Sequence, residues 1–149
     1  MSVRPPRINH VAMSVPPSLL TGAAKDELVA FYTEVFGWTH LTMMDDDAKR
    51  VVFQTYSLEQ FVYLHGEDTP MSCPRLDHYG FSVGTEAELD EFLARCRAYK
   101  ERDDRVDIID KHTDDHGPLA ISAFYVGYLL PMMVEIQWWD MKDGARTGA

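Results

Sequence analysis

The sequence repeats itself at about half its length, and this repeat limits the possible folds more than any other feature. Residues 8–15, INHVAMSV, are similar to residues 76–83, LDHYGFSV, with His, Ser and Val in register. A repeat of this size is one supersecondary unit that cannot bury its hydrophobic face alone. The chain is therefore expected to contain two copies of one small module that pack together.

An amphipathic helix is predicted after each of these segments, because apolar residues recur there at i, i+3, i+4 and i+7. These residues are Leu28, Phe31, Tyr32 and Val35 in the first half, and Leu89, Phe92, Leu93 and Cys96 in the second. Thr85 and Glu88 have the spacing of a capping box, and Gly37 is placed to end the first helix. Both helices should therefore have defined ends.

Three strand-like runs follow each helix. They cover about residues 39–44, 51–56 and 60–65 in the first half, and 106–110, 119–126 and 132–138 in the second. Each half is thus predicted to be a βαβββ module, the first at about 7–67 and the second at about 75–140, joined by the proline-containing segment 68–75. A chain of 149 residues is the size of one domain, so we expect a single α+β domain with a curved mixed sheet.

The strand faces separate polar from apolar residues. Side chains alternate along a strand, so His10 and His78 lie on the face opposite the valines and other apolar residues expected under the helices. The last strands of the two halves align so that Tyr63 is equivalent to Glu135, and the same alternation places Gly80 with His78 and Gln137 with Glu135. Polar groups of both modules are therefore expected on the concave face of the sheet.

His10, His78 and Glu135 are the candidate metal ligands. A glutamate inside the apolar run MMVEIQWW is costly to bury without a partner, and a metal ion is one such partner. Two imidazoles and a carboxylate suit Fe(II), and Mn, Zn or Ni are alternatives. Each residue alone is better explained as a bonded histidine or a glutamate paired with arginine, but the repetition favours the metal.

Charge and hydropathy exclude several classes of function. The formal net charge is −10 and basic residues do not cluster, which argues against binding to nucleic acid or to an anionic membrane. No apolar run reaches the length of about 20 residues that spans a bilayer, and the first residues lack a secretory signal. We expect a cytoplasmic protein whose partner is a small molecule.

Paired βαβββ modules with these ligands resemble the vicinal oxygen chelate superfamily. It includes glyoxalase I, fosfomycin-resistance enzymes, bleomycin-binding proteins and type I extradiol dioxygenases, and the resemblance covers nearly the whole chain. HTDDH at 112–116, SAFY at 122–125 and then Glu135 are similar to the His-Thr-Asn-Asp-His, Ser-Phe-Tyr and Glu segments of extradiol dioxygenases. The chain length is similar to that of the compact members that cleave dihydroxyphenylalanine.

This resemblance implies an Fe(II) extradiol dioxygenase, with dioxygen as co-substrate and a catechol as aromatic substrate. Carried over residue by residue, His112 would hydrogen-bond a substrate hydroxyl, Asp115 would support the pocket and Tyr125 would contact catechol or oxygen. His65 could act as acid–base, because the usual catalytic histidine is absent near Gln60. Further substrate contacts are expected at Tyr63, His116 and Tyr128.

The sequence also departs from the extradiol pattern. Residues 128–131, YLLP, replace a Thr-Pro-Ser-Gly turn, and Asp114 replaces an asparagine. The alternatives are a glyoxalase-like or fosfomycin-resistance-like isomerase or transferase, and a non-catalytic drug-binding resistance protein. A homodimer is expected, because related two-module chains commonly assemble that way.

Overall fold

The computed structural model describes residues 3–142 and divides the chain between Ser72 and Cys73 into two compact units. We call the described parts module one (residues 3–72) and module two (residues 73–142), and each is described by itself. No helix in residues 3–142 combines the length and the apolar character needed to cross a membrane.

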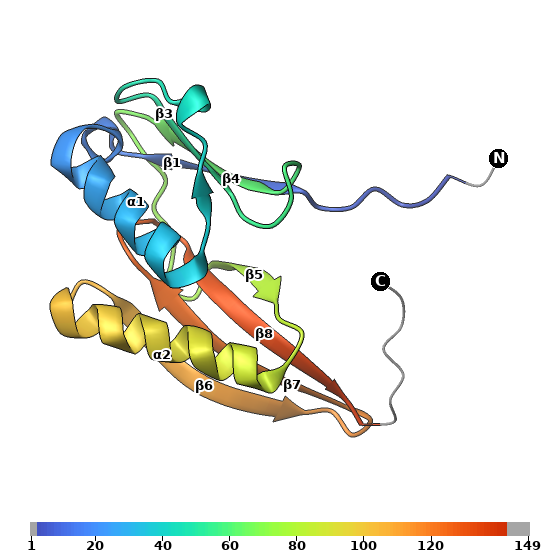
Figure 1. The fold of residues 1–149 in the computed structure, drawn as a ribbon. Helices are drawn as coiled ribbons and strands as arrows, with labels where there is room; N and C mark the ends of the chain where they lie inside the picture. The colour runs from blue at the N-terminus through green and yellow to red at the C-terminus, as the bar shows by residue number, and fades with distance from the viewer. Residues whose placement is uncertain (1–2, 143–149) are drawn as a thin grey trace. The chain divides into compact units, whose positions relative to one another are not determined.

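Module one is a four-stranded mixed sheet with one long helix (Figure 1). Its elements are β1 (His10–Val15), the 3-10 turn η1 (Pro17–Leu20), α1 (Gly22–Phe36), β2 (Thr39–His40), the 3-10 turn η2 (Thr42–Met44), β3 (Arg50–Gln54) and β4 (Phe61–Gly66). The strand order is β1-β4-β3-β2, with β1 parallel to β4 and the other pairs antiparallel. The first and last strands of the module, β1 and β4, therefore lie side by side.

The predicted apolar face of α1 is confirmed. Leu28, Phe31, Tyr32 and Val35 are all buried, and Tyr32 stacks on Trp38 just beyond the helix end. The helix ends at Gly37, whose φ of 69° is in the left-handed region that glycine adopts without strain. The sequence pattern therefore fixed both the face that α1 buries and the point where it stops.

Module two repeats the same order. Its elements are β5 (His78–Ser82), α2 (Glu86–Arg102), β6 (Asp107–Asp115), β7 (Leu119–Gly127) and β8 (Met133–Met141). The strand order is β5-β8-β7-β6, with β5 parallel to β8. The capping box predicted at Thr85 and Glu88 is present. Each of the two side chains accepts a hydrogen bond from the backbone N–H of the other residue. The prediction of two βαβββ modules is confirmed.

Two strands differ most from their predicted lengths. The run 39–44 is a strand only at Thr39–His40, after which the chain turns through η2, where the carbonyl of Met44 accepts a hydrogen bond from Arg50. The strand predicted at 106–110 continues to Asp115, because its second part pairs with β7. The segment 112–115 is therefore part of the sheet and not a loop.

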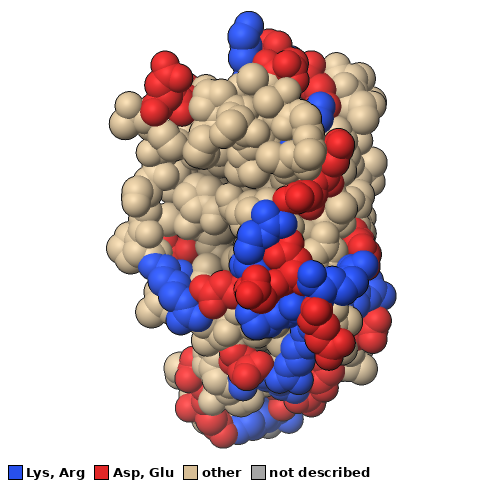
Figure 2. Space-filling view, turned by 90° about the vertical axis from the view of Figure 1, so that its left-hand side faces the viewer, with Lys and Arg blue, Asp and Glu red and all other residues tan. Residues whose placement is uncertain are grey.

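Charged side chains on the surface are mostly paired. Helix α2 contributes Arg95 to an ion pair with Glu91 within the helix and Arg97 to one with Asp110 on β6. In the lower part of the face drawn in Figure 2, acidic and basic side chains are interleaved. Exposed pairs of this kind contribute little stability each, so the apolar cores carry most of it.

Candidate metal site

Glu135 lies at the centre of one face of the module two sheet. It is directly opposite Gly80 on β5 and Tyr125 on β7, and residues opposite each other share a face. His78 precedes Gly80 by two positions and shares that face, as the alternation predicts. Three neighbouring strands therefore place His78, Glu135 and Tyr125 together.

His78 and Glu135 face each other with two electron-rich atoms. The Nδ1–H of His78 donates to the carbonyl oxygen of Leu76 at 2.7 Å, so in the neutral ring Nε2 carries a lone pair. That Nε2 lies 3.3 Å from Oε2 of Glu135, whose residue is only 6% exposed. Two acceptors at this distance need either a proton or a bound cation between them.

The pair fits a divalent metal ion. Two ligand atoms about 2.1 Å from one ion lie about 3.0–3.4 Å apart for coordination angles between octahedral and tetrahedral. Within residues 3–142, no lysine or arginine forms an ion pair with Glu135. A hydrogen bond from the distal ring nitrogen to a backbone carbonyl is the usual way in which a metal-binding histidine is oriented.

Gly80 leaves room for the carboxylate. A Cβ atom at this position would lie 3.3 Å from Oε2 of Glu135, which is tighter than an ordinary contact. The absence of a side chain on β5 therefore lets the glutamate lie flat against the neighbouring strand. The sequence placed Gly80 on this face but assigned it no role.

Tyr125 connects the pair to His112. Its ring is 5.0 Å from the ring of His78 in an edge-to-face contact, and it stacks on His112 at 5.8 Å with 5° between the planes. Burial, together with a hydrogen bond to Glu135, raises the pKa of Tyr125 to about 12. Its hydroxyl is therefore protonated at neutral pH and acts as a donor.

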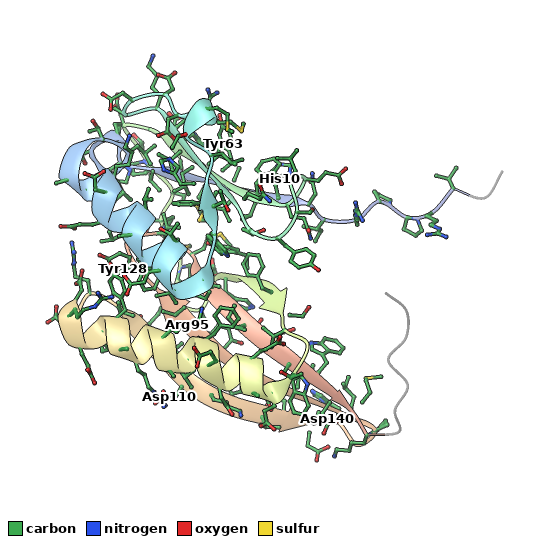
Figure 3. All side chains as sticks on the ribbon, viewed as in Figure 1. His10, Tyr63, Arg95, Asp110, Tyr128 and Asp140 are labelled. Atoms are coloured by element: carbon green, nitrogen blue, oxygen red, sulfur yellow. The ribbon has the colours of Figure 1, made fainter. Side chains whose placement is uncertain are left out.

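A β-bulge in β6 brings His112 to this face. Ile109 pairs with Tyr125 and His112 pairs with Ala123, so three steps along β6 match two steps along β7. The two residues between them, Asp110 and Lys111, both reach α2: Asp110 binds Arg97 at 2.8 Å, and Lys111 contacts Glu86 and Asp90 at 2.7 Å. The labelled Asp110 can be located on β6 beside α2 in Figure 3.

Module one carries the third predicted ligand. The ring of His10 stacks on Phe61 at 4.8 Å, and its Nδ1 is 2.8 Å from Oδ1 of Asn9. With the proton on Nδ1, the lone pair of Nε2 is available to a metal ion, as it is in His78. His10 and Tyr63 are labelled on the strands of module one in Figure 3. Within the described residues, no three His, Cys, Asp or Glu side chains form a metal-binding group. The role of His10 as third ligand therefore stays a prediction.

The other predicted site residues lie in different surroundings. His65 and Tyr63 both lie on β4, with their ring centres 6.2 Å apart, and His65 contacts Glu67 at 3.1 Å. Asp115 pairs with Lys142 at 2.7 Å, and His116 is exposed in the turn after β6.

Tyr128 is buried and not on the face of Glu135. Its ring packs 5.8 Å from Tyr99 of α2, and its hydroxyl donates to Asp103 at 2.8 Å, so it lies on the helix side of the sheet. The structure brings Tyr125 to the His78–Glu135 pair and His112 to Tyr125, but it does not bring Asp115, His116 or Tyr128 there.

A pocket of about 440 Å³ opens beside Glu135. It is lined by residues 80–83 at the end of β5 and by Glu135, Gln137 and Trp139 of β8. The last three alternate along one strand face, so a single strand supplies one wall. The alternation predicted that Gln137 shares the face of Glu135, whereas the contribution of Trp139 to this wall was missed.

The fold of the two modules is the vicinal oxygen chelate fold, with a histidine–glutamate pair that fits a divalent ion on the second sheet. The chain matches no protein-family profile and no curated protein by sequence. Its similarity to known proteins is therefore structural, and it is low in sequence.

Among solved structures, lactoylglutathione lyase from Agrobacterium tumefaciens superposes with a TM-score of 0.63 at 19% identity, over 90% of this chain and 94% of that chain. The fosfomycin resistance protein FosX from Listeria monocytogenes superposes with a TM-score of 0.61 at 15% identity, over 95% and 100%. A FosX mutant complexed with Mn(II) and 1S,2S-dihydroxypropylphosphonic acid gives a TM-score of 0.59 at 15% identity, over 87% of each chain.

Proposed function

We propose that this protein is a divalent-metal-dependent enzyme in which His10, His78 and Glu135 hold the ion. The observation that carries the proposal is the buried Glu135 carboxylate facing the lone pair of His78 at 3.3 Å, with no basic side chain paired to it in the described chain. The same fold holds Mn(II) in the FosX mutant complex, which supports this proposal.

The proposed reaction is an isomerisation or group transfer on a small substrate that carries oxygen donors, as in the glyoxalase-like and fosfomycin-resistance-like alternative. When bound, the ion supplies Lewis-acid polarisation of a substrate oxygen. Glu135 brings negative charge to a buried position, where electrostatic interactions are stronger than in bulk water. The structural comparisons support this class over the dioxygenase.

Residues beside the pair handle the substrate and its protons. Tyr125 stays protonated at neutral pH, so it can hydrogen-bond an oxygen but cannot accept a proton as a base. His112 stacks on Tyr125 and carries an imidazole, the most common general acid–base group in enzymes. The pocket beside Glu135 provides the space in which a small substrate is oriented.

Metal binding followed by activity measurements tests the proposal. The purified protein is stripped with a chelator and reloaded with Mn(II), Fe(II), Zn(II) or Ni(II), and bound metal is counted per chain. We expect one ion per chain in the wild type and none in His10→Ala, His78→Ala or Glu135→Ala. Full metal content in one of these variants would remove that residue from the proposed site.

A second candidate function is extradiol ring cleavage with Fe(II) and dioxygen. The observation that favours it is the row of rings from His112 through Tyr125 to His78, which joins the HTDDH motif to the proposed ligands. The described lining of the pocket has one carboxylate and no lysine or arginine, which suits a neutral catechol better than an anionic substrate. Oxygen uptake with a panel of catechols, after anaerobic loading with Fe(II), separates the two functions.

The assembly is proposed to be a homodimer, as the related two-module chains suggest. Sedimentation of the purified protein at several concentrations tests this expectation. A single species with the mass of one chain, 17.0 kDa, would contradict it.

A further inference from the structure

Three side chains in a row on β8 form a hydrogen-bonded series that ends at Glu135. Trp139 Nε1–H donates to Oε1 of Gln137 at 2.8 Å, and Gln137 Nε2–H donates to Oε2 of Glu135 at 2.9 Å. Residues at positions i, i+2 and i+4 of a strand share a face, so regular strand geometry is enough to align them. The series runs from the half-exposed wall of the pocket to the buried carboxylate.

The direction of the amide in this series is fixed by its neighbours. An indole N–H can only donate, and an ionised carboxylate can only accept. The amide of Gln137 therefore has to present its oxygen to Trp139 and its NH₂ group to Glu135. A flipped amide would place its NH₂ group against the indole N–H of Trp139 and its oxygen against the carboxylate of Glu135. Both contacts would be repulsive, so only one amide orientation is allowed.

The bonded oxygen is also the one that faces His78. Oε2 of Glu135 lies 3.3 Å from Nε2 of His78 and would be 3.3 Å from a Cβ at position 80. One atom thus receives the bond from Gln137 and lies at the proposed ion position. A change at Gln137 acts on the orientation of that oxygen without touching the ion.

We propose that Gln137 and Trp139 are positioning residues that hold the Glu135 carboxylate in its metal-binding orientation. This inference rests on the proposed metal site and deepens it, since it assigns part of the metal affinity to residues that do not bind the ion. Partners that orient a metal-binding side chain typically contribute about 10–100-fold in metal affinity.

The test compares Mn(II) affinity in the full chain for the wild type, Gln137→Met, Trp139→Phe and Trp138→Phe. Gln137→Met keeps the side-chain length and removes the amide, and Trp139→Phe keeps an aromatic wall but removes the N–H. Trp138→Phe is the matched control, because Trp138 is the neighbouring residue on the other face of β8. Free Mn(II) is measured by electron paramagnetic resonance during titration.

We expect affinity to fall by about 10–100-fold in Gln137→Met and by about tenfold or less in Trp139→Phe, whose indole acts through the amide. Trp138→Phe should bind as the wild type does. The visible bands of the Co(II)-loaded protein, measured at saturating Co(II), should shift in the first two variants only. A loss of general stability alone would leave these bands unchanged.

The outcomes separate the two ideas. If the wild type binds Mn(II) and all variants bind it equally, the positioning role is refuted while the metal site stands. The same holds if Trp138→Phe weakens binding as much as Gln137→Met does. If the wild type binds no ion, the metal site and the positioning role are both refuted.

Discussion

Replacing Glu135 with glutamine should change the stability of the protein in opposite directions with and without metal. In the metal-free protein, Glu135 is a buried carboxylate that faces the lone pair of His78 and accepts hydrogen bonds from Gln137 and Tyr125. With its oxygen in the place of Oε2, the amide of Glu135→Gln still accepts from Gln137, but it cannot donate to His78 from the same position. The variant therefore removes a buried charge and keeps the hydrogen bond from Gln137.

The size of the effect follows from these contacts. Burying a carboxylate costs several kcal/mol, and each charge-assisted hydrogen bond that it accepts returns about 1.5–3 kcal/mol, so two such bonds offset most but not all of the cost. We expect Glu135→Gln to stabilise the metal-free protein by about 1–2 kcal/mol, which raises Tm by about 2–8 °C for a chain of this size. An ion at 100 times its Kd stabilises the wild type by about 2.7 kcal/mol, or about 5–11 °C.

Thermal unfolding in excess chelator and in excess Mn(II) measures both effects. Glu135→Gln should have the higher Tm in chelator and should gain nothing from Mn(II), so the order of the two proteins reverses. Glu67→Gln is the control, because Glu67 also contacts a histidine, His65, but is exposed in module one. It should respond to Mn(II) as the wild type does.

Two results would refute the reasoning. A lower Tm for Glu135→Gln in chelator would mean that the carboxylate is fully compensated without an ion. An equal response of Glu135→Gln and the wild type to Mn(II) would mean that the ion is bound elsewhere.

Three further predictions concern other parts of the structure. Hydrogen bonds from Arg105 and from the hydroxyl of Tyr128 hold the pKa of Asp103 well below the usual range of an aspartate. The stabilising effect of the Asp103 carboxylate is therefore present above about pH 4 and is lost as the pH falls toward the lowered pKa. The Tm of Asp103→Asn should therefore lie below that of the wild type at pH 7, and the two should converge in acid; a constant gap would contradict this. Gly80→Ala should weaken Mn(II) binding about tenfold by displacing the carboxylate, whereas Gly84→Ala, which crowds a glutamate outside the site, should leave binding unchanged. His112→Phe and Tyr125→Phe should keep the ion but lose about 10²–10⁴-fold in turnover on the best substrate; near-normal rates would remove them from the reaction.

The repeat and the strand alternation predicted most of what positions the site. The equivalence of residues 8–15 and 76–83 indicated two βαβββ modules, and both are present. Alternation placed His78, Gly80 and Glu135 on one face, and the structure brings His78 and Glu135 within 3.3 Å. These features depend on local periodicity, which one sequence contains in full.

Other features depend on contacts that local patterns do not encode. The early end of the strand after α1 follows from contacts around η2, such as the bond from Arg50 to the carbonyl of Met44. The link from Trp139 through Gln137 to Glu135 needs specific rotamers, which alternation alone does not determine. The motif at 112–116 predicted a role for His112, but not that a bulge would place it.

That bulge makes β6 unusually tolerant of a change in length. Losing one residue inside a strand normally turns every later side chain to the wrong face. Here Ile109 and His112 already share a face across two residues, so loss of either Asp110 or Lys111 would leave a regular strand with the same pairing to β7. Insertions and deletions between relatives are therefore expected at this point within the sheet, at the expense of the one ion pair to α2 that Asp110 makes or the two that Lys111 makes. An alignment of such chains should place its gap there, because His112 keeps its place opposite Ala123 in both lengths.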